Sequence, residues 1–187
     1  MSTRLVTEED YKFFDFLAPY RWPNQSKSLI ANYRQLVETG EIQIETLVEN
    51  ALAQASQGLY TRVCEDSYDF CDGSEAKKSV SCFRQNDYSR GQWTNSFAIT
   101  NLKNKTGLIR AVCYSKQQDQ FYFFAIPFAA YQGMSRIDIV LDTFSGYEGD
   151  PKGIPRGKWT RFQVDSFEQL AQLKPREARR VPYNGIF

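Results

Sequence analysis

The sequence predicts an α+β fold in which N-terminal helices pack on a central mixed, mostly antiparallel β-sheet. Residues 1–58 repeat apolar side chains at helical spacing, and residues 59–187 contain runs that alternate apolar and polar side chains or are apolar throughout. The chain has 187 residues, of which 42% are hydrophobic, and this is enough for one hydrophobic core. We therefore expect a single domain over residues 1–187, with a helical portion first and then a sheet portion that ends in a helix.

Capping residues and helix breakers bound the first two helices. Thr7 is a capping residue followed by three acids, which favour the positive end of a helix dipole, and the aromatic helix after it is expected to end near Pro19. Ser26 or Ser28 caps the second helix, and Gly40 ends it.

The third helix, residues 44–55, carries apolar side chains at the i, i+3, i+4 and i+7 positions and ends at Gly58. Glu45 and Glu49 flank this apolar face. We interpret them as solvated side chains, with a supporting contact to a metal ion as the alternative.

Alternating and continuous apolar runs predict the strands of the second portion. The run 121–126 is apolar throughout, which is typical of a central strand. Strands are expected over residues 59–68, 74–83, 95–102, 108–116, 120–127 and 136–141 and near 159–164, with a short helix at 127–131 and a last helix at 167–173.

The composition excludes several classes of enzyme. The chain contains no histidine, so Ser-His-Asp and Cys-His catalysis and zinc sites with histidine ligands are excluded. The four cysteines form no C-x-x-C pair, so we expect free thiols and no structural zinc. No apolar run is long enough to span a bilayer, and the N-terminus lacks the apolar core of a signal peptide, so we expect a cytoplasmic protein without a membrane partner.

The candidate site is the stretch 69–77, DFCDGSEAK, which holds three carboxylates and one amine. Asp72-Gly73 between two predicted strands indicates a hairpin, because this dipeptide tolerates the positive φ angles of a tight turn. Glu75 and Lys77 are two residues apart, so they share one face of a strand. Carboxylates and a lysine gathered by such a turn would bind a hard divalent cation and hold an anionic substrate beside it.

An aspartate followed by Glu-x-Lys at a strand hairpin, after helices, resembles the PD-(D/E)xK nuclease superfamily, which includes many type II restriction endonucleases. The Glu-x-Lys part corresponds to Glu75 and Lys77. The resemblance covers about a third of the chain, from the third helix to the strand after Lys77. No proline precedes the aspartate, and Asp66, Asp69 and Asp72 compete for the first position of the motif.

The resemblance implies a restriction-endonuclease-like domain that cuts double-stranded DNA at specific sequences, with Mg²⁺ and without an organic cofactor. It also implies a homodimer, because a duplex cutter needs two active sites. Glu75, one of Asp69 and Asp72, and the carbonyl oxygen of Ala76 are the expected metal ligands. Lys77 would orient or help to deprotonate the attacking water, or hold the phosphate.

The basic residues are unevenly placed. The net charge is only +1, but residues 77–110 contain seven basic residues and one acid. Such a band is typical of a phosphate-binding face, with a solvated surface as the alternative, and Arg, Gln and Asn are the residue types that read bases. The residues expected to contact DNA are Lys78, Arg84, Arg90, Gln92, Asn95, Lys103 and Lys105.

Two other functions fit the same sequence. One is a nucleic-acid-binding or partner-binding module that keeps the turn without chemistry, because turns rich in Asp and Ser are common. The other is an unrelated α+β enzyme in which Tyr, Asp and Arg residues act.

Overall fold

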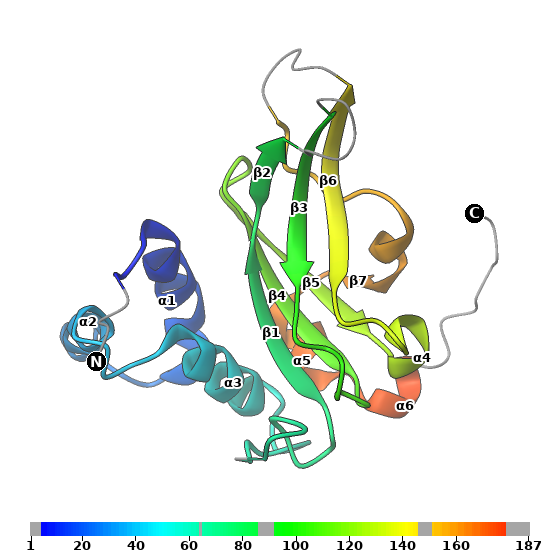
Figure 1. The fold of residues 1–187 in the computed structure, drawn as a ribbon. Helices are drawn as coiled ribbons and strands as arrows, with labels where there is room; N and C mark the ends of the chain where they lie inside the picture. Colours follow the sequence, from blue (N-terminus) through cyan, green and yellow to red (C-terminus); the bar gives the residue numbers. More distant parts are fainter. Residues whose placement is uncertain (1–4, 64, 86–91, 146–150, 179–187) are drawn as a thin grey trace.

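The computed structural model of the protein describes residues 5–63, 65–85, 92–145 and 151–178 (Figure 1). The helices are α1 (Glu8–Arg21), α2 (Lys27–Glu38), α3 (Ile44–Ala55), α4 (Phe128–Tyr131), the 3-10 helix η1 (Lys158–Phe162), α5 (Phe167–Gln172) and α6 (Pro175–Ala178). The strands are β1 (Glu75–Val80), β2 (Cys82–Gln85), β3 (Gln92–Ile99), β4 (Ile109–Ser115), β5 (Gln120–Ile126), β6 (Ile137–Ser145) and β7 (Gln163–Val164).

The strands form two sheets. A four-stranded sheet has the order β1-β4-β5-β7, with β1 parallel to β4 and the other pairs antiparallel. An antiparallel sheet has the order β2-β3-β6. Figure 1 shows α1, α2 and α3 together on one side of β1. This is the expected α+β fold, with helices first and mostly antiparallel strands after them.

Strand β4 divides the hydrophobic core into two parts, because its side chains alternate between two faces and every one of its residues is buried. Val112 and Tyr114 pack in a cluster with the apolar faces of α1, α3 and α5. Ala111 and Cys113 pack in a second cluster with residues of the three-stranded sheet. The order is therefore helices, four-stranded sheet, three-stranded sheet. β5, next to β4, is also internal, as its apolar run predicts.

The predicted caps of the first two helices are confirmed. The Thr7 hydroxyl accepts a hydrogen bond from the Asp10 N–H, and the Asp10 carboxylate accepts one from the Thr7 N–H, at 3.2 and 3.0 Å. Ser26, not Ser28, caps α2. The predicted end of α1 near Pro19 is confirmed to within two residues, since the helix ends at Arg21. Proline removes one N–H donor in the last turn, but the other bonds of that turn suffice to close it.

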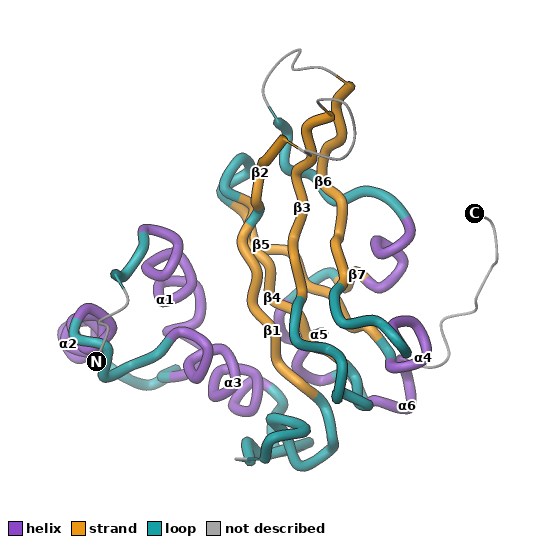
Figure 2. The backbone as a smooth tube through the Cα atoms, in the orientation of Figure 1, coloured by secondary structure: helices purple, strands orange, loops and turns teal. Residues whose placement is uncertain are grey.

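The predicted strand at residues 59–68, and with it the hairpin at Asp72-Gly73, is wrong. Among the described residues of this segment, Arg62 forms an isolated bridge with Phe70, and β1 pairs with β4. Figure 2 shows the chain between α3 and β1 as loop. Tyr60 turns into the helical core, so this segment cannot extend beside β1. The tight turn itself is present, with Gly73 at φ +80°.

The predicted strand at residues 74–83 is split between the sheets. Its first part is β1 and its second part continues into β2, with Ser81 alone between them. The N–H of Ser81 donates to the Tyr114 carbonyl oxygen at 2.9 Å, and its hydroxyl accepts from the Lys116 N–H at 2.9 Å. One run of backbone therefore leaves the first sheet and enters the second.

The remaining elements lie within a few residues of their predicted positions, except that η1 replaces most of the last predicted strand. The cysteines that the structure describes, Cys71, Cys82 and Cys113, are free thiols as expected. Among the described helices, none combines the length and the apolar character that crossing a membrane requires.

A close backbone contact holds the turn before β1 against the loop before β4. A Cβ atom placed on Gly107 would lie 1.8 Å from the Gly73 carbonyl oxygen. Only glycine fits there, because a side chain would collide with main-chain atoms that cannot rotate away.

We expect Gly107→Ala to lower the free energy of unfolding by about 3 kcal/mol, because the backbone must shift to admit the methyl group. Gly40→Ala is the control. Gly40 has φ +78° but open space at its Cβ position, so this change should cost only about 1 kcal/mol of backbone strain. Urea unfolding measures both. Equal losses in the two variants would contradict the role of the Gly73 contact.

Candidate functional site

A cavity of about 420 Å³ lies along the edge of β1 that faces away from β4. We call it the β1 pocket. Its walls come from α3, the loop before β1, β1 itself and the end of β3. The lining residues are Glu45, Val48, Glu49, Asp69, residues 75–80, Ala98, Thr100 and Asn101. Four predicted site residues, Asp69, Glu75, Ala76 and Lys77, therefore line one pocket.

The edge of β1 sets the positions of these groups. The Ala76 N–H donates to Asp69 Oδ2 at 2.8 Å, whereas the Glu75 N–H points the other way, to the Leu108 carbonyl oxygen at 2.9 Å. Since the N–H and C=O groups of one strand residue point to the same side, the Ala76 carbonyl oxygen also faces the pocket edge. The Asp69 carboxylate and the Ala76 carbonyl are thus neighbours.

Glu75 lies between two lysines. Its Oε1 atom is 2.9 Å from Lys77 Nζ and 2.9 Å from Lys105 Nζ. The pair with Lys77 confirms that the two side chains share one face of β1. Glu75 Oε2 is buried and accepts no hydrogen bond from any residue in the described part of the chain. A buried carboxylate oxygen without a partner is costly unless something binds it.

The environment of Asp69 favours its protonated form. Burial, together with the negative charges of Glu75 and Glu49, raises the pKa of Asp69 from 3.8 to about 6. The Ala76 N–H and Lys105 oppose this shift. A carboxylate whose charge is disfavoured in this way gains most when a cation binds beside it.

The oxygen groups at the β1 pocket fit a hard divalent cation in type. Asp69, Glu75 and the Ala76 carbonyl supply the oxygens that Mg²⁺ takes in proteins, and Mg²⁺ keeps several waters. The fit requires rearrangement of side chains. Among the described residues, no three Cys, Asp or Glu side chains lie close enough together to form a ready metal site. For an ion to bind there, the contacts of Lys77 and Lys105 with Glu75 would have to break.

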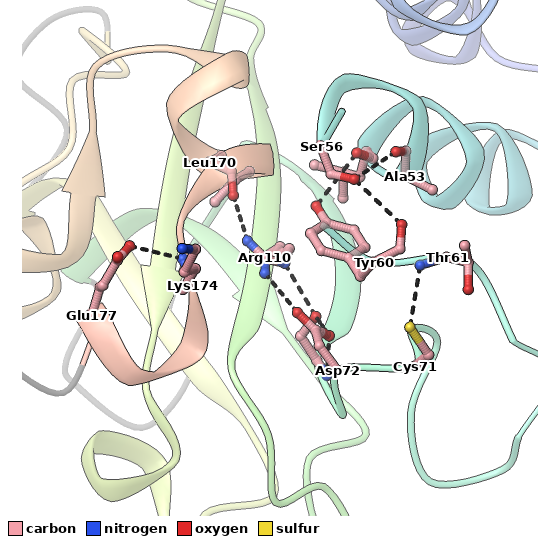
Figure 3. A network of polar contacts seen from close by, with 12 residues as sticks. Ala53, Ser56, Tyr60, Thr61, Cys71, Asp72, Arg110, Leu170, Lys174 and Glu177 are labelled. Carbon is pink, nitrogen blue, oxygen red and sulfur yellow. Dashed lines mark hydrogen bonds and ion pairs between the residues drawn. The ribbon is translucent and has the colours of Figure 1, made fainter. Parts of the chain in front are cut away.

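Asp72 does not face the β1 pocket. Its Oδ2 accepts a hydrogen bond from Arg110 at 3.0 Å, and its Oδ1 accepts one from the Ser74 N–H at 2.9 Å (Figure 3). Asp72 lines a different, smaller cavity. Of the aspartates left open by the sequence, Asp69 is the one that the fold brings to Glu75 and Lys77; Asp66 is exposed.

Arg110 is fully buried on the helix-facing side of β4. Its three nitrogens donate to Ser74 Oγ, the Leu170 carbonyl oxygen and Asp72 at 3.1, 2.6 and 3.0 Å, and its guanidinium lies 4.3 Å from the centre of the Tyr60 ring (Figure 3). This network joins the turn before β1 to α5. Sequence reasoning counted Arg110 only as part of the basic band. The signal was a single cation inside the apolar run 108–114, which indicates a buried, paired charge.

Two predicted DNA contacts point inward. Lys78 Nζ lies 3.5 Å from an Asp10 carboxylate oxygen and 3.4 Å from one of Glu45, so it ties β1 to the helices. Asn95 is fully buried, and its amide lies 3.5 Å from Asp142 Oδ2. Asn95 is thus enclosed in the protein, whereas Lys78, although paired with two acids, still lines the β1 pocket.

The remaining predicted DNA contacts differ in their exposure to solvent. Arg84 and Lys103 are exposed. Lys105 contacts Glu75, a contact that sequence reasoning missed because no local pattern relates the two. Arg90 and the side chain of Gln92 lie outside the described residues.

The chain matches no protein-family model, and comparison with curated proteins and with solved structures finds no significant match. The function proposed below therefore depends on the geometry of this chain alone.

We expect Asp72→Asn to lower the free energy of unfolding by about 3 kcal/mol, because it leaves the buried Arg110 charge without its counter-ion. Asp138→Asn is the matched control, since the Arg136–Asp138 pair is exposed and should contribute less than about 1 kcal/mol. Urea unfolding at neutral pH measures both, and similar small losses in the two variants would contradict a structural role for Asp72.

The raised pKa of Asp69 predicts a pH dependence of stability. In the unfolded chain this carboxyl loses its proton near pH 3.8, but in the folded chain only near pH 6, so the folded form is penalised increasingly as pH rises between these values. We expect Asp69→Asn to gain stability relative to the wild type from pH 4 to pH 7, by on the order of 1 kcal/mol, since partial exposure weakens the effect. Urea unfolding across this range measures the difference. A difference that does not change with pH would show that Asp69 titrates alike in both states.

Proposed function

We propose that this protein is a Mg²⁺-dependent endonuclease that hydrolyses phosphodiester bonds in double-stranded DNA at specific sequences, as type II restriction enzymes do. One observation carries the proposal. Asp69, Glu75, Ala76 and Lys77, which make up the nuclease-like motif, line a single pocket although Asp69 lies in a loop and the others on a strand.

The charges of the β1 pocket support a role for a divalent cation. Its lining contains four acids, Glu45, Glu49, Asp69 and Glu75, but only two lysines. The cationic groups nearby are already paired with Glu45, Glu49 and Glu75, so an added positive charge would be needed to attract an anionic phosphodiester. Bound Mg²⁺ supplies that charge, stabilises the negative charge that develops on the phosphate, and lowers the pKa of a coordinated water.

Each group of the chain has a defined task in this proposal. Asp69, Glu75 and the Ala76 carbonyl oxygen hold the ion. Lys77, on the same strand face as Glu75, orients the attacking water or contacts a non-bridging phosphate oxygen. Glu49 on α3 lies near Asp69, and its pair with Arg62 balances its negative charge at the rim of the pocket.

Cutting both strands of a duplex requires two such sites. We therefore include in the proposal a homodimer in which each copy attacks one strand. Exposed Arg84 and Lys103 are the described basic side chains that we assign to DNA contacts.

The test is digestion of a plasmid of known sequence by the purified protein, with and without Mg²⁺. We expect discrete fragments only with Mg²⁺. Glu75→Gln and Lys77→Ala should each lower the cleavage rate at least about 100-fold, because each removes a group that acts on the phosphate or the water. Duplex binding in a gel shift should change little.

Asp69→Asn and Asp72→Asn form a matched pair of isosteric changes within one turn. The first should abolish cleavage. The second should retain it per folded molecule, because Asp72 pairs with Arg110 away from the pocket. Retained cleavage by the Glu75 variant would exclude the site. Duplex binding by the wild type without Mg²⁺-dependent products would instead favour a non-catalytic nucleic-acid-binding module.

A further inference from the structure

Lys105 occupies an unusual place for a residue of a polar loop. It lies between β3 and β4, yet its side chain is only 14% exposed, and its ammonium donates to the Asp66 carbonyl oxygen at 3.1 Å while it pairs with Glu75 at 2.9 Å. Its own N–H bonds to the carbonyl oxygen of Leu102, which is buried and anchors the loop. The loop therefore holds this ammonium against Glu75.

Glu75 does not need two ammonium partners. Both lysines contact the same oxygen, Oε1, while Oε2 is buried without a partner among the described residues. One positive charge suffices to balance one carboxylate. A divalent cation bound by Glu75 would share its carboxylate with both ammonium groups, and cations held a few ångströms apart repel each other strongly.

We infer that Lys105 is an internal counter-ion of Glu75 that a divalent cation displaces, and that the displaced ammonium then becomes available to the phosphate of the substrate. This inference deepens the proposed function and rests on it for the identity of the substrate.

Lys105, not Lys77, is the lysine that moves. Lys77 lines the β1 pocket and has a task there in the proposed function, whereas Lys105 is not a lining residue, so Lys105 can leave Glu75 without removing a group from the pocket. Lys105 is held by the Glu75 contact and by one carbonyl oxygen of an exposed loop residue, Asp66. A lysine side chain can leave such a position by rotating about its own bonds, so the backbone need not move.

Displacement has a thermodynamic consequence. Binding of the cation must break the Glu75–Lys105 pair, so the pair weakens cation binding in the absence of DNA. A phosphate that binds the released ammonium compensates for this loss, and the cation and the DNA then strengthen each other's binding by the same factor. The Glu75–Lys105 pair thus keeps cation affinity low until DNA binds.

The experiment measures Mn²⁺ binding to the full chain without DNA, by titration calorimetry or by the paramagnetic resonance signal of free Mn²⁺. Mn²⁺ is used because it accepts oxygen ligands as Mg²⁺ does. We expect Lys105→Met to bind Mn²⁺ about tenfold more tightly than the wild type, because the competing charge is gone. Lys105→Arg, which keeps the charge, should bind no more tightly than the wild type.

Lys152→Met is the control, because Lys152 is an exposed lysine that does not line the β1 pocket, so this change should not alter Mn²⁺ affinity. Circular dichroism checks that each variant is folded. Should Lys105→Met misfold, Lys105→Gln replaces it, with the same expected gain.

The inference is overturned if a folded, uncharged Lys105 variant binds Mn²⁺ as the wild type does or more weakly, or if no form binds Mn²⁺. If either result is obtained while the wild type still cuts DNA with Mg²⁺, this inference fails but the proposed function stands. If Lys105→Met binds more tightly but no DNA is cut, the displaced lysine is supported and the nuclease proposal fails.

Discussion

The bonds of one buried guanidinium determine which acid reaches the β1 pocket. Arg110 cannot be solvated, so its charge must be balanced inside the protein, and Asp72 provides the balance. Because Asp72 and Ser74 both bond to Arg110, which also bonds to Leu170 of α5, the turn that contains them is fixed. Asp69, at the start of that turn, is then left on the opposite side, where it meets the free N–H of Ala76.

The pairing of β1 with β4 makes this possible. Ala76 lies directly across from Arg110 in the parallel register, so the buried cation and the pocket-facing backbone of Ala76 are on neighbouring strands. The Gly73–Gly107 contact brings the two preceding loops together just before that pairing begins. A structural network and a candidate chemical site thus share one short piece of backbone.

Local patterns in the sequence predicted local structure well. The Thr7 cap, the apolar face of the third helix and the apolar run of β5 each depend on near neighbours, and all three are confirmed. The spacing of Glu75 and Lys77 likewise placed them on one face. These are properties of a few consecutive residues, which sequence periodicity describes directly.

What the sequence did not reveal depends on distant residues. The residues on both sides of the Asp72-Gly73 turn have a strand-like pattern, which predicted a hairpin. In the structure β1 pairs with β4 instead, and no local pattern indicates which distant strand will pair. The choice between Asp69 and Asp72 depends on Arg110, and the role of Lys105 depends on how its loop closes over β1. The basic band is mostly compensated for the same reason, since Lys77, Lys78, Lys105 and Arg110 each meet a carboxylate from elsewhere in the fold or along the strand.

The passage of one backbone run from the first sheet to the second at Ser81 has a mechanical consequence. The two sheets cannot slide past each other, because the run that forms an edge of one becomes an edge of the other after a single residue. β2 is joined through Ser81 directly to the strand that carries Glu75 and Lys77, so a displacement of β2 along its length must be taken up by β1 or by the backbone at Ser81.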